Sequence, residues 1–297
     1  MKTSFLNRLH VWVLAARPRT LPAAAAPVIV GSAVAFYVGG FRPLPALAAL
    51  AAALLLQIGA NIANDYFDYF KGADAGERLG PLRVTQAGLA SPAEVRGAML
   101  VVFGLAGMVG LYLVWLGGWP ILVAGLLSIL AAIAYTGGPL PFGYYGLGDV
   151  FAFLFFGPVA VCGSVYVQLH ALPPLAVWAS LPIGWLVVAI LIVNNLRDIA
   201  SDGAVGKRTL AVRLGRQGAR AEYVLMLLAA YLVPPVLISL QAAPLWILLS
   251  WLSLALVPHL LKVILTQEGR PLNRALAGTG QLVLVYGLGF AAGLLIG

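Results

Sequence analysis

The chain has 297 residues, of which 62% are hydrophobic and 9% are charged, and its formal net charge is +8. A water-soluble domain of this length needs a polar surface, so the composition excludes that class of protein. Apolar runs of about 20 residues recur along the chain, and each is long enough to cross a bilayer. The sequence therefore predicts an all-α integral membrane protein.

The predicted elements begin with a short amphipathic helix on the membrane surface, formed by the apolar stretch LHVWVLAA before RPRT. Nine membrane spans follow it, and we expect them to build one membrane-embedded domain over residues 1–297. The approximate limits of the spans are 20–40, 44–64, 95–116, 119–136, 148–168, 174–196, 222–240, 244–266 and 275–296.

Basic residues are distributed unequally between the two sides of this predicted bundle. With a cytoplasmic N-terminus, the inner segments hold 17 of the 18 Lys and Arg residues, and Arg42 alone lies outside. Cytoplasmic loops of membrane proteins carry such an excess. We therefore expect a cytoplasmic N-terminus, and basic loops that contact anionic membrane lipid rather than nucleic acid.

Six of the ten acidic residues lie in two short clusters on the cytoplasmic side; five belong to two motifs, and Glu77 follows the first of them. The first motif, residues 61–74, reads NIANDYFDYFKGAD, and the second, residues 194–202, reads NNLRDIASD. A helix that continues through either motif presents its polar side chains as one stripe. These side chains are Asn61, Asn64, Asp65 and Asp68 in the first motif and Asn194, Asn195, Asp198 and Asp202 in the second. Asp74 follows Gly72 and is expected on a loop that folds back.

The two motifs also indicate a weak internal repeat. Asp65 and Asp198 are 133 residues apart, each follows an apolar span, and each precedes a basic, glycine-containing loop. Two related halves that face each other would bring both acid motifs to one cavity. We therefore expect a single site between two weakly repeated halves.

Carboxylates that converge on one site need a cation between them. Two of them about 5 Å apart repel by roughly 3 kcal/mol at an effective dielectric near 20. Mg²⁺ suits such oxygen ligands and is usually shared with a substrate phosphate. Basic residues beside the motifs, including Lys71, Arg197, Lys207 and Arg208, can neutralise the rest of a diphosphate. In an apolar bundle, that diphosphate is expected to carry a prenyl chain, whose allylic C–O bond breaks as the diphosphate leaves.

Four stretches then carry a resemblance to a known family: ARPRTLPAAAAPVIVGSA at 16–33, QIGANIANDYFDYFKGAD at 57–74, AYTGGPLPFGYYGLGDVFAFLFFGPVAV at 134–161 and NNLRDIASDGAVGKRTLAVRLG at 194–215. They are similar to the UbiA superfamily of intramembrane aromatic prenyltransferases, and within it to the branch of menaquinone biosynthesis that prenylates 1,4-dihydroxy-2-naphthoate. The resemblance implies nine helices around a central cavity, in a bacterial cytoplasmic membrane, with the active site toward the cytoplasm.

The resemblance also implies roles for single residues. The Mg²⁺ site would comprise Asn64, Asp65, Asp68, Asp74, Asp198 and Asp202, with Arg197, Lys207, Arg208 and Lys71 on the diphosphate. Asp68 and Asp198 are expected to be catalytic together with Asp149, an isolated acid that could orient or deprotonate the naphthol. Asn195 and Tyr135 are expected to bind the acceptor. Five residues separate Asp68 from Asp74, where the common superfamily spacing has three; the longer spacing is that of the naphthoate branch.

The expected reaction transfers a polyprenyl group from polyprenyl diphosphate to 1,4-dihydroxy-2-naphthoate with loss of CO₂, which yields a demethylmenaquinone. An alternative in the same class is another aromatic acceptor, such as 4-hydroxybenzoate or homogentisate. An ion-coupled transporter is the alternative from another class, and it predicts acids near mid-membrane. Prenyl chain length and oligomeric state do not follow from the sequence.

Overall fold

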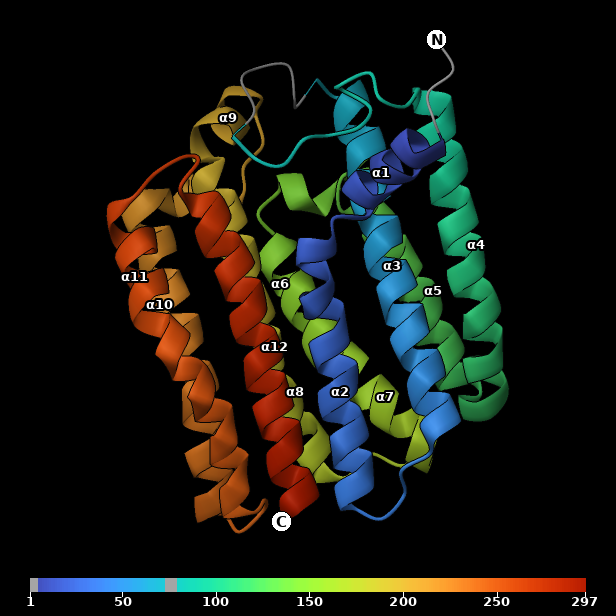
Figure 1. The fold of residues 1–297 in the computed structure, drawn as a ribbon, viewed down its shortest axis with the longest axis vertical. Helices are drawn as coiled ribbons and strands as arrows, with labels where there is room; N and C mark the ends of the chain where they lie inside the picture. The colour runs from blue at the N-terminus through green and yellow to red at the C-terminus, as the bar shows by residue number, and fades with distance from the viewer. Residues whose placement is uncertain (1–4, 73–78) are drawn as a thin grey trace.

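The computed structural model describes residues 5–72 and 79–297, and every regular element in them is helical (Figure 1). The first half comprises α1 Phe5–Ala16, η1 Pro18–Thr20, α2 Leu21–Tyr37, α3 Pro43–Phe70, α4 Pro92–Gly117, α5 Trp119–Ala134 and η2 Phe142–Tyr144. The second half comprises α6 Gly148–Leu154, η3 Phe155–Val159, α7 Ala160–Leu169, α8 Pro174–Arg197, α9 Ile199–Ala204, α10 Leu210–Ser239, η4 Leu245–Leu256, α11 Val257–Thr266 and α12 Leu272–Ile296.

Most of the predicted membrane spans correspond to long apolar helical segments. In the described part of the chain, eight segments are long and apolar enough to cross a membrane, and they match eight of the nine predicted spans. The ninth, predicted at 119–136, forms the apolar helix α5, which has 16 residues. At 1.5 Å per residue such a helix is about 24 Å long, less than the roughly 30 Å of a bilayer's hydrocarbon core. The all-helical membrane fold is confirmed, whereas a count of nine crossings and a cytoplasmic N-terminus stay predictions.

The helices run side by side, and the short helix α1 lies across one end of the bundle (Figure 1). This is the helix predicted from LHVWVLAA. It is separated from α2 by Arg17, whose φ of 51° is left-handed and breaks the helical path. The last helix, α12, ends at the opposite end of the bundle (Figure 1). α9 lies at the same end as α1, so this end collects the segments that carry the two acid motifs.

Local sequence signals account for several helix starts. Ser91 caps α4, because its hydroxyl accepts from the Glu94 backbone N–H while the Glu94 carboxylate accepts from the Ser91 backbone N–H at 2.9 Å. Pro92 follows at the first helical position, where a missing N–H costs nothing. Thr209 caps α10 through its side chain alone, which accepts from Val212 N–H at 3.2 Å. Both caps fix where the chain leaves a loop near the acid motifs and enters the bundle.

The core of the bundle forms around α8 and α12. α12 packs against η4, α2 and α8, and α8 also packs against α10. Gly289 and Gly293 of α12 face the backbone of η4 so closely that a Cβ at Gly293 would lie 2.3 Å from the carbonyl oxygen of Trp246. Small residues four apart permit this approach, as is common between membrane helices. The close packing fixes α12, which carries Asn273 to the site described next.

Candidate active site

The first acid motif occupies the last turns of α3. The helix continues to Phe70, as the motif's periodicity predicts. Asn61, the first polar residue of the stripe, is buried and donates to the Ala16 carbonyl oxygen and to Thr20 Oγ1, both at 2.9 Å. Gln57, one turn earlier, also donates to Thr20 Oγ1, at 3.2 Å. These bonds join α3 to the α1–η1 segment, so this end of the stripe is structural.

The next two residues of the stripe contact the loops that follow α3 and α5. Asp65 is buried, and its two carboxylate oxygens accept from the backbone N–H groups of Val84 at 2.9 Å and Thr85 at 3.3 Å. The side-chain oxygen of Asn64 accepts from Thr136 Oγ1 at 2.9 Å. Both residues therefore shape the wall of the site, and their place among the Mg²⁺ ligands stays a prediction.

Asp68 lies at the centre of the first motif and has two partners. Its Oδ2 forms an ion pair with the guanidinium of Arg83, which also donates to the Asn64 carbonyl oxygen. Its Oδ1 accepts a 2.8 Å hydrogen bond from the hydroxyl of Tyr144. The Asp68 side chain is only 4% exposed. A buried carboxylate of this kind needs such compensation, because desolvation of an unpaired charge is costly.

Tyr144, the last residue of η2, contacts cations as well as Asp68. Lys71 Nζ lies 4.7 Å and Lys207 Nζ 5.5 Å from the centre of its ring, within the range of a cation–π interaction. Burial raises the pKa of the Tyr144 phenol, and the neighbouring Asp68 raises it further. The phenol therefore stays protonated and keeps donating to Asp68. Lys71 in turn donates to the Thr136 carbonyl oxygen.

The second motif differs from its prediction, because no continuous helix carries it. α8 ends at Arg197, α9 begins at Ile199, and Asp198 lies at the break with φ −97° and ψ 10°. The single stripe expected for residues 194–202 is therefore wrong. The break lets Asp198 approach the Arg197 side chain, whose Nε donates to Asp198 Oδ1 at 2.8 Å and whose Nη2 donates to Oδ2.

Arg197 is the most heavily bonded residue of the predicted diphosphate set. It is 3% exposed and, besides Asp198, donates to Asn194 Oδ1 at 2.8 Å and to Asn273 Oδ1 at 2.9 Å. Asn273, at the start of α12, also donates to the Leu79 carbonyl oxygen at 2.7 Å. The guanidinium therefore joins the second acid motif to α12 and to the loop after the first motif.

Asp202 has a carboxylate oxygen that lacks a hydrogen-bond partner. Its Oδ1 lies 3.3 Å from Lys207 Nζ, while its Oδ2 is buried and unbonded among the residues that the structure describes. Burial raises the pKa of Asp202, with Lys207 acting in the opposite direction. Because Lys207 also lies beside the Tyr144 ring, Tyr144 lies between Asp68 of the first motif and the Asp202–Lys207 pair of the second. The two motifs thus border one site.

The predicted acceptor residues lie next to this site. Tyr135 packs against the η2–α6 segment, where a Cβ at Gly148 would lie 3.4 Å from its hydroxyl oxygen. The Tyr135 hydroxyl therefore lies against the first turn of α6, the helix that carries Asp149. Asp149 Oδ2 and Asn195 Oδ1 are buried and, in the described ranges, have no hydrogen-bond partner. Arg208 differs, since its side chain is exposed and its backbone N–H donates to the Tyr144 carbonyl oxygen at 2.9 Å.

The oxygen donors fit a hard divalent cation. Asp68, Asp198 and Asp202 supply carboxylates, and the unbonded Oδ2 of Asp202 is an anionic atom that a cation would satisfy. In the described residues, no three His, Cys, Asp or Glu side chains already form a metal-binding cluster. Each of the three aspartates instead pairs with a protein cation, namely Arg83, Arg197 or Lys207. Asp74 lies outside the described residues.

Three residues complete the site without belonging to the predicted set. Arg83 and Tyr144 both contact Asp68, and Asn273 contacts Arg197. Arg83 and Tyr144 come from loops, and Asn273 is 76 residues from Arg197 along the chain. The sequence offers a signal for two of them. Tyr144 follows shortly after YTGGP, and Arg83 lies in the basic loop GPLRVTQAGL.

The chain is similar in sequence to a known family and to named proteins of that family. A model of the UbiA prenyltransferase family matches residues 24–285. The 1,4-dihydroxy-2-naphthoate octaprenyltransferase of Escherichia coli (strain K12) is 42% identical over 86% of this chain and 84% of its own length. The protein of the same name from Mycobacterium tuberculosis is 38% identical over 96% of this chain and 97% of its own length.

Solved structures show the same fold at low sequence identity. A UbiA homolog from Aeropyrum pernix K1 has a TM-score of 0.68 at 17% identity and covers 91% of this chain and 97% of that one. A UbiA homolog from Archaeoglobus fulgidus, solved with GPP and Mg²⁺, has a TM-score of 0.64 at 13% identity, over 95% and 99% of the two chains. The family model and the close relatives together show that the chain belongs to the UbiA prenyltransferase family.

Proposed function

We propose that this protein transfers a polyprenyl group from polyprenyl diphosphate to 1,4-dihydroxy-2-naphthoate, with loss of CO₂, in menaquinone biosynthesis. Its relatives from E. coli and M. tuberculosis carry the name of that octaprenyltransferase, at 42% and 38% identity. The arrangement around Tyr144 supports the proposal from the structure, because it borders one site with carboxylates from both motifs. A substrate headgroup at this place can contact both motifs at once.

The donor half of the reaction rests on Asp68, Asp198 and Asp202, which would hold Mg²⁺. Support comes from the archaeal relative that was solved with GPP and Mg²⁺. When bound, Mg²⁺ would neutralise charge on the departing diphosphate. Arg197 and Lys207 already pair with acids of the site, and Lys71 lies beside Tyr144, so the three cations can turn to the diphosphate as it arrives.

The acceptor half needs groups that orient the naphthol and accept its proton. Asp149 is buried and carries an unbonded Oδ2, so it can accept a hydrogen bond or a proton from the acceptor. Tyr135 can donate from its phenol, and Asn195 presents an unbonded amide oxygen. The allylic C–O bond of the donor breaks, diphosphate leaves, and the new C–C bond forms at the ring carbon that bears the carboxylate. CO₂ then leaves with its bonding electrons returned to the ring, so the product of this step is at the hydroquinone level. We assign the site to the cytoplasmic side of the membrane, where the basic loops are expected.

An assay of the purified protein in detergent tests this proposal. It would combine Mg²⁺, prenyl diphosphates of several chain lengths, and 1,4-dihydroxy-2-naphthoate, 4-hydroxybenzoate or homogentisate as acceptor. We expect consumption of the naphthoate with one CO₂ released per prenyl group transferred, and loss of turnover when EDTA removes the metal. Turnover with hydroxybenzoate alone would contradict the proposal. An Asp202→Asn variant provides the inactive control.

A further inference from the structure

A cleft on the surface of the bundle lies outside the active site. It has a volume of about 530 Å³ and lies between α12 and the η4–α11 segment, with η1 at its edge. Its apolar walls include Leu256, Leu260 and Ala277. Such a volume lies within the roughly 300–1,000 Å³ of small-molecule sites. The cleft is thus large enough for part of an organic ligand.

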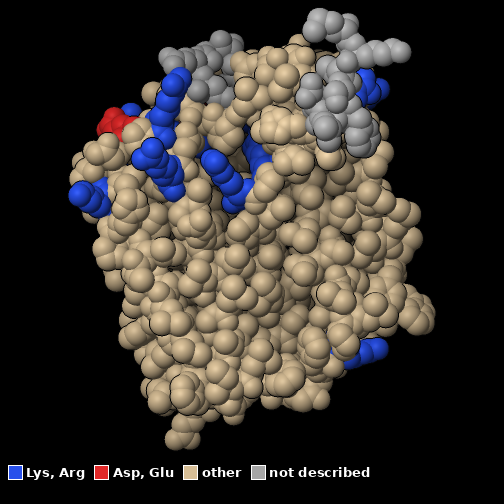
Figure 2. Space-filling model, viewed as in Figure 1, with Lys and Arg blue, Asp and Glu red and all other residues tan. Residues whose placement is uncertain are grey.

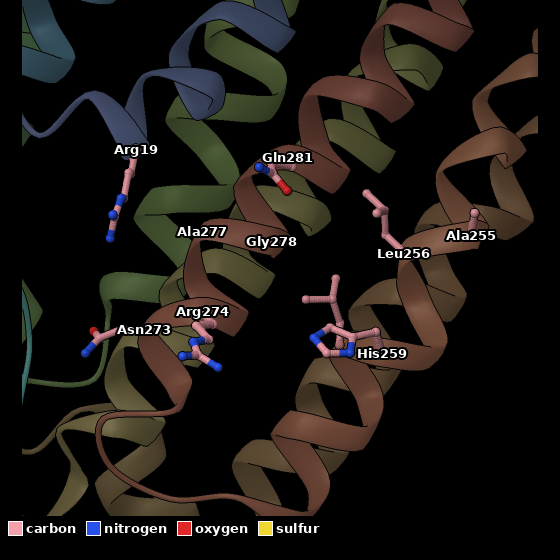
Figure 3. Close-up of a pocket in the computed structure, with 10 residues that line it drawn as sticks. Arg19, Ala255, Leu256, His259, Asn273, Arg274, Ala277, Gly278 and Gln281 are labelled. Carbon is pink, nitrogen blue, oxygen red and sulfur yellow. The ribbon is translucent and has the colours of Figure 1, made fainter.

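The polar residues of the cleft are cationic or neutral. Arg19, His259 and Arg274 line it together with Gln281 and Asn273, and no acidic residue is among the described residues that line it. The side chains of Arg19, His259 and Arg274 are exposed, and within the described part of the chain none makes a hydrogen bond or ion pair. Figure 3 shows the His259 ring extending from α11 toward α12, with Arg274 at the neighbouring end of α12. These side chains can donate hydrogen bonds to a bound anion.

The position of the cleft favours a lipid over a soluble anion. Figure 2 shows Lys and Arg side chains gathered at one end of this face, above a broad belt without charged residues. In a membrane protein such a belt faces hydrocarbon, and cations at its border meet lipid headgroups. The cleft combines both environments, because its walls are apolar and its charged groups are arginines. Basic pockets between membrane helices on the cytoplasmic side are a known mode of anionic-lipid binding.

We propose that this cleft binds an anionic phospholipid of the surrounding leaflet. The phosphate would lie between Arg274 and His259 with Arg19 beside it, and the acyl chains would follow the apolar wall toward the membrane core. The expected ligand therefore combines one negatively charged phosphate with an apolar tail. A zwitterionic phospholipid offers the same tail, but its added cationic group offsets the attraction of the arginines.

One residue connects this cleft with the active site. Asn273 lines the cleft, and its Oδ1 accepts from Arg197 Nη1 at 2.9 Å. A lipid that orders the start of α12 therefore acts on a side chain that positions Arg197 and, through it, Asp198. Lipid in the cleft is expected to support the geometry of the second acid motif.

Native mass spectrometry of the detergent-solubilised full chain tests the proposal through binding rather than turnover. Phosphatidylglycerol and phosphatidylcholine would be added in turn, and retained lipid counted. We expect wild-type protein to retain phosphatidylglycerol in preference, and Arg274→Gln to lower its affinity about fivefold. Arg274→Lys should restore most of it. The matched control is Arg96→Gln, which removes an exposed cation of α4, on another part of the bundle.

Two further measurements distinguish a lipid site from the alternatives. Ala277→Phe fills the cleft without a change of charge, and it should also lower retention of phosphatidylglycerol. Geranyl diphosphate distinguishes a lipid site from a donor site. It should not displace the lipid, and in detergent without added lipid its own affinity should be the same in Arg274→Gln and wild type. The proposal is overturned if Arg274→Gln and Arg96→Gln lose lipid equally, or if geranyl diphosphate competes for the cleft. Neither result depends on which acceptor the enzyme uses.

Discussion

Tyr144 donates a 2.8 Å hydrogen bond to Oδ1 of Asp68, from a loop 76 residues further along the chain. The same ring lies 5.5 Å from Lys207 Nζ, and Lys207 pairs with Asp202. A residue of the η2 turn therefore lies between carboxylates that belong to two separate motifs. The relationship gives the site a neutral hydrogen-bond donor among charged groups, and it suggests a direct test.

Replacement of Tyr144 by phenylalanine removes the hydroxyl but keeps the ring beside both lysines. Asp68 then loses one of its partners and its fixed orientation. Hydrogen bonds to charged groups contribute about 1.5–3 kcal/mol, so we expect kcat/KM for prenyl transfer to fall about 10- to 100-fold. Tyr145→Phe is the control, because Tyr145 is 48% exposed. Equal activity of the two variants would show that the Tyr144 hydroxyl has no role.

Arg197→Lys tests the guanidinium hydrogen bonds that hold Asp198 in place. The guanidinium donates to Asp198, Asn194 and Asn273 at once, and an ammonium group cannot match this planar geometry. We expect the Kd of geranyl diphosphate in the presence of Mg²⁺ to rise roughly tenfold or more, measured by calorimetry. Arg213→Lys serves for comparison, since Arg213 donates to the Tyr145 carbonyl oxygen on the exposed side. An unchanged Kd in Arg197→Lys would rule out its positioning role.

Asp149→Asn separates the acceptor half of the reaction from the donor half. The variant keeps the shape of the buried side chain but cannot accept the proton of the naphthol. We expect kcat to fall by about 100-fold or more, which is the usual range for loss of a general base. Binding of geranyl diphosphate, followed by calorimetry, should stay unchanged. Undiminished turnover of Asp149→Asn would exclude Asp149 from the chemistry.

Gly293→Ala tests the packing of α12 on η4. The added Cβ would lie 2.5 Å from Ile247 Cα and still closer to the Trp246 carbonyl oxygen, so the two elements must separate. Overpacking of this kind costs about 1–3 kcal/mol, and we expect a lower thermal unfolding temperature in detergent. In contrast, Gly104→Ala on α4 meets no atom within 4 Å and should be neutral or slightly stabilising. Equal unfolding temperatures would contradict the close contact.

The sequence predicted the parts of the fold and site that depend on local periodicity. Apolar runs located the membrane spans, and the polar stripe on α3 was expected because a helix repeats every 3.6 residues. The break at Asp198 was not expected, since neither glycine nor proline marks it in NNLRDIASD. At this break the Arg197 side chain bonds both carboxylate oxygens of Asp198, a contact that periodicity does not describe.

Contacts between distant segments escaped prediction for a related reason. Arg83 and Tyr144 reach Asp68 from loops, and a loop's path is set by tertiary contacts such as those between Asp65 and the backbone at Val84 and Thr85. Asn273 reaches Arg197 from the start of the last helix, with no motif to indicate it. The carboxylates of the site, together with Arg197 and Lys207, could thus be named from the sequence, whereas Arg83 and the Tyr144 hydroxyl, which contact Asp68, had no assigned role.

In the proposed mechanism, Asp68 and Asp202 serve one metal–diphosphate site. Crystals grown with Mn²⁺ and a non-hydrolysable prenyl diphosphate analogue test it most directly, because anomalous scattering locates the metal. We expect manganese peaks bridged by the diphosphate, with carboxylate ligands from both the 61–74 and the 194–202 motifs. Manganese bound by one motif alone, with the diphosphate remote from the other, would contradict it.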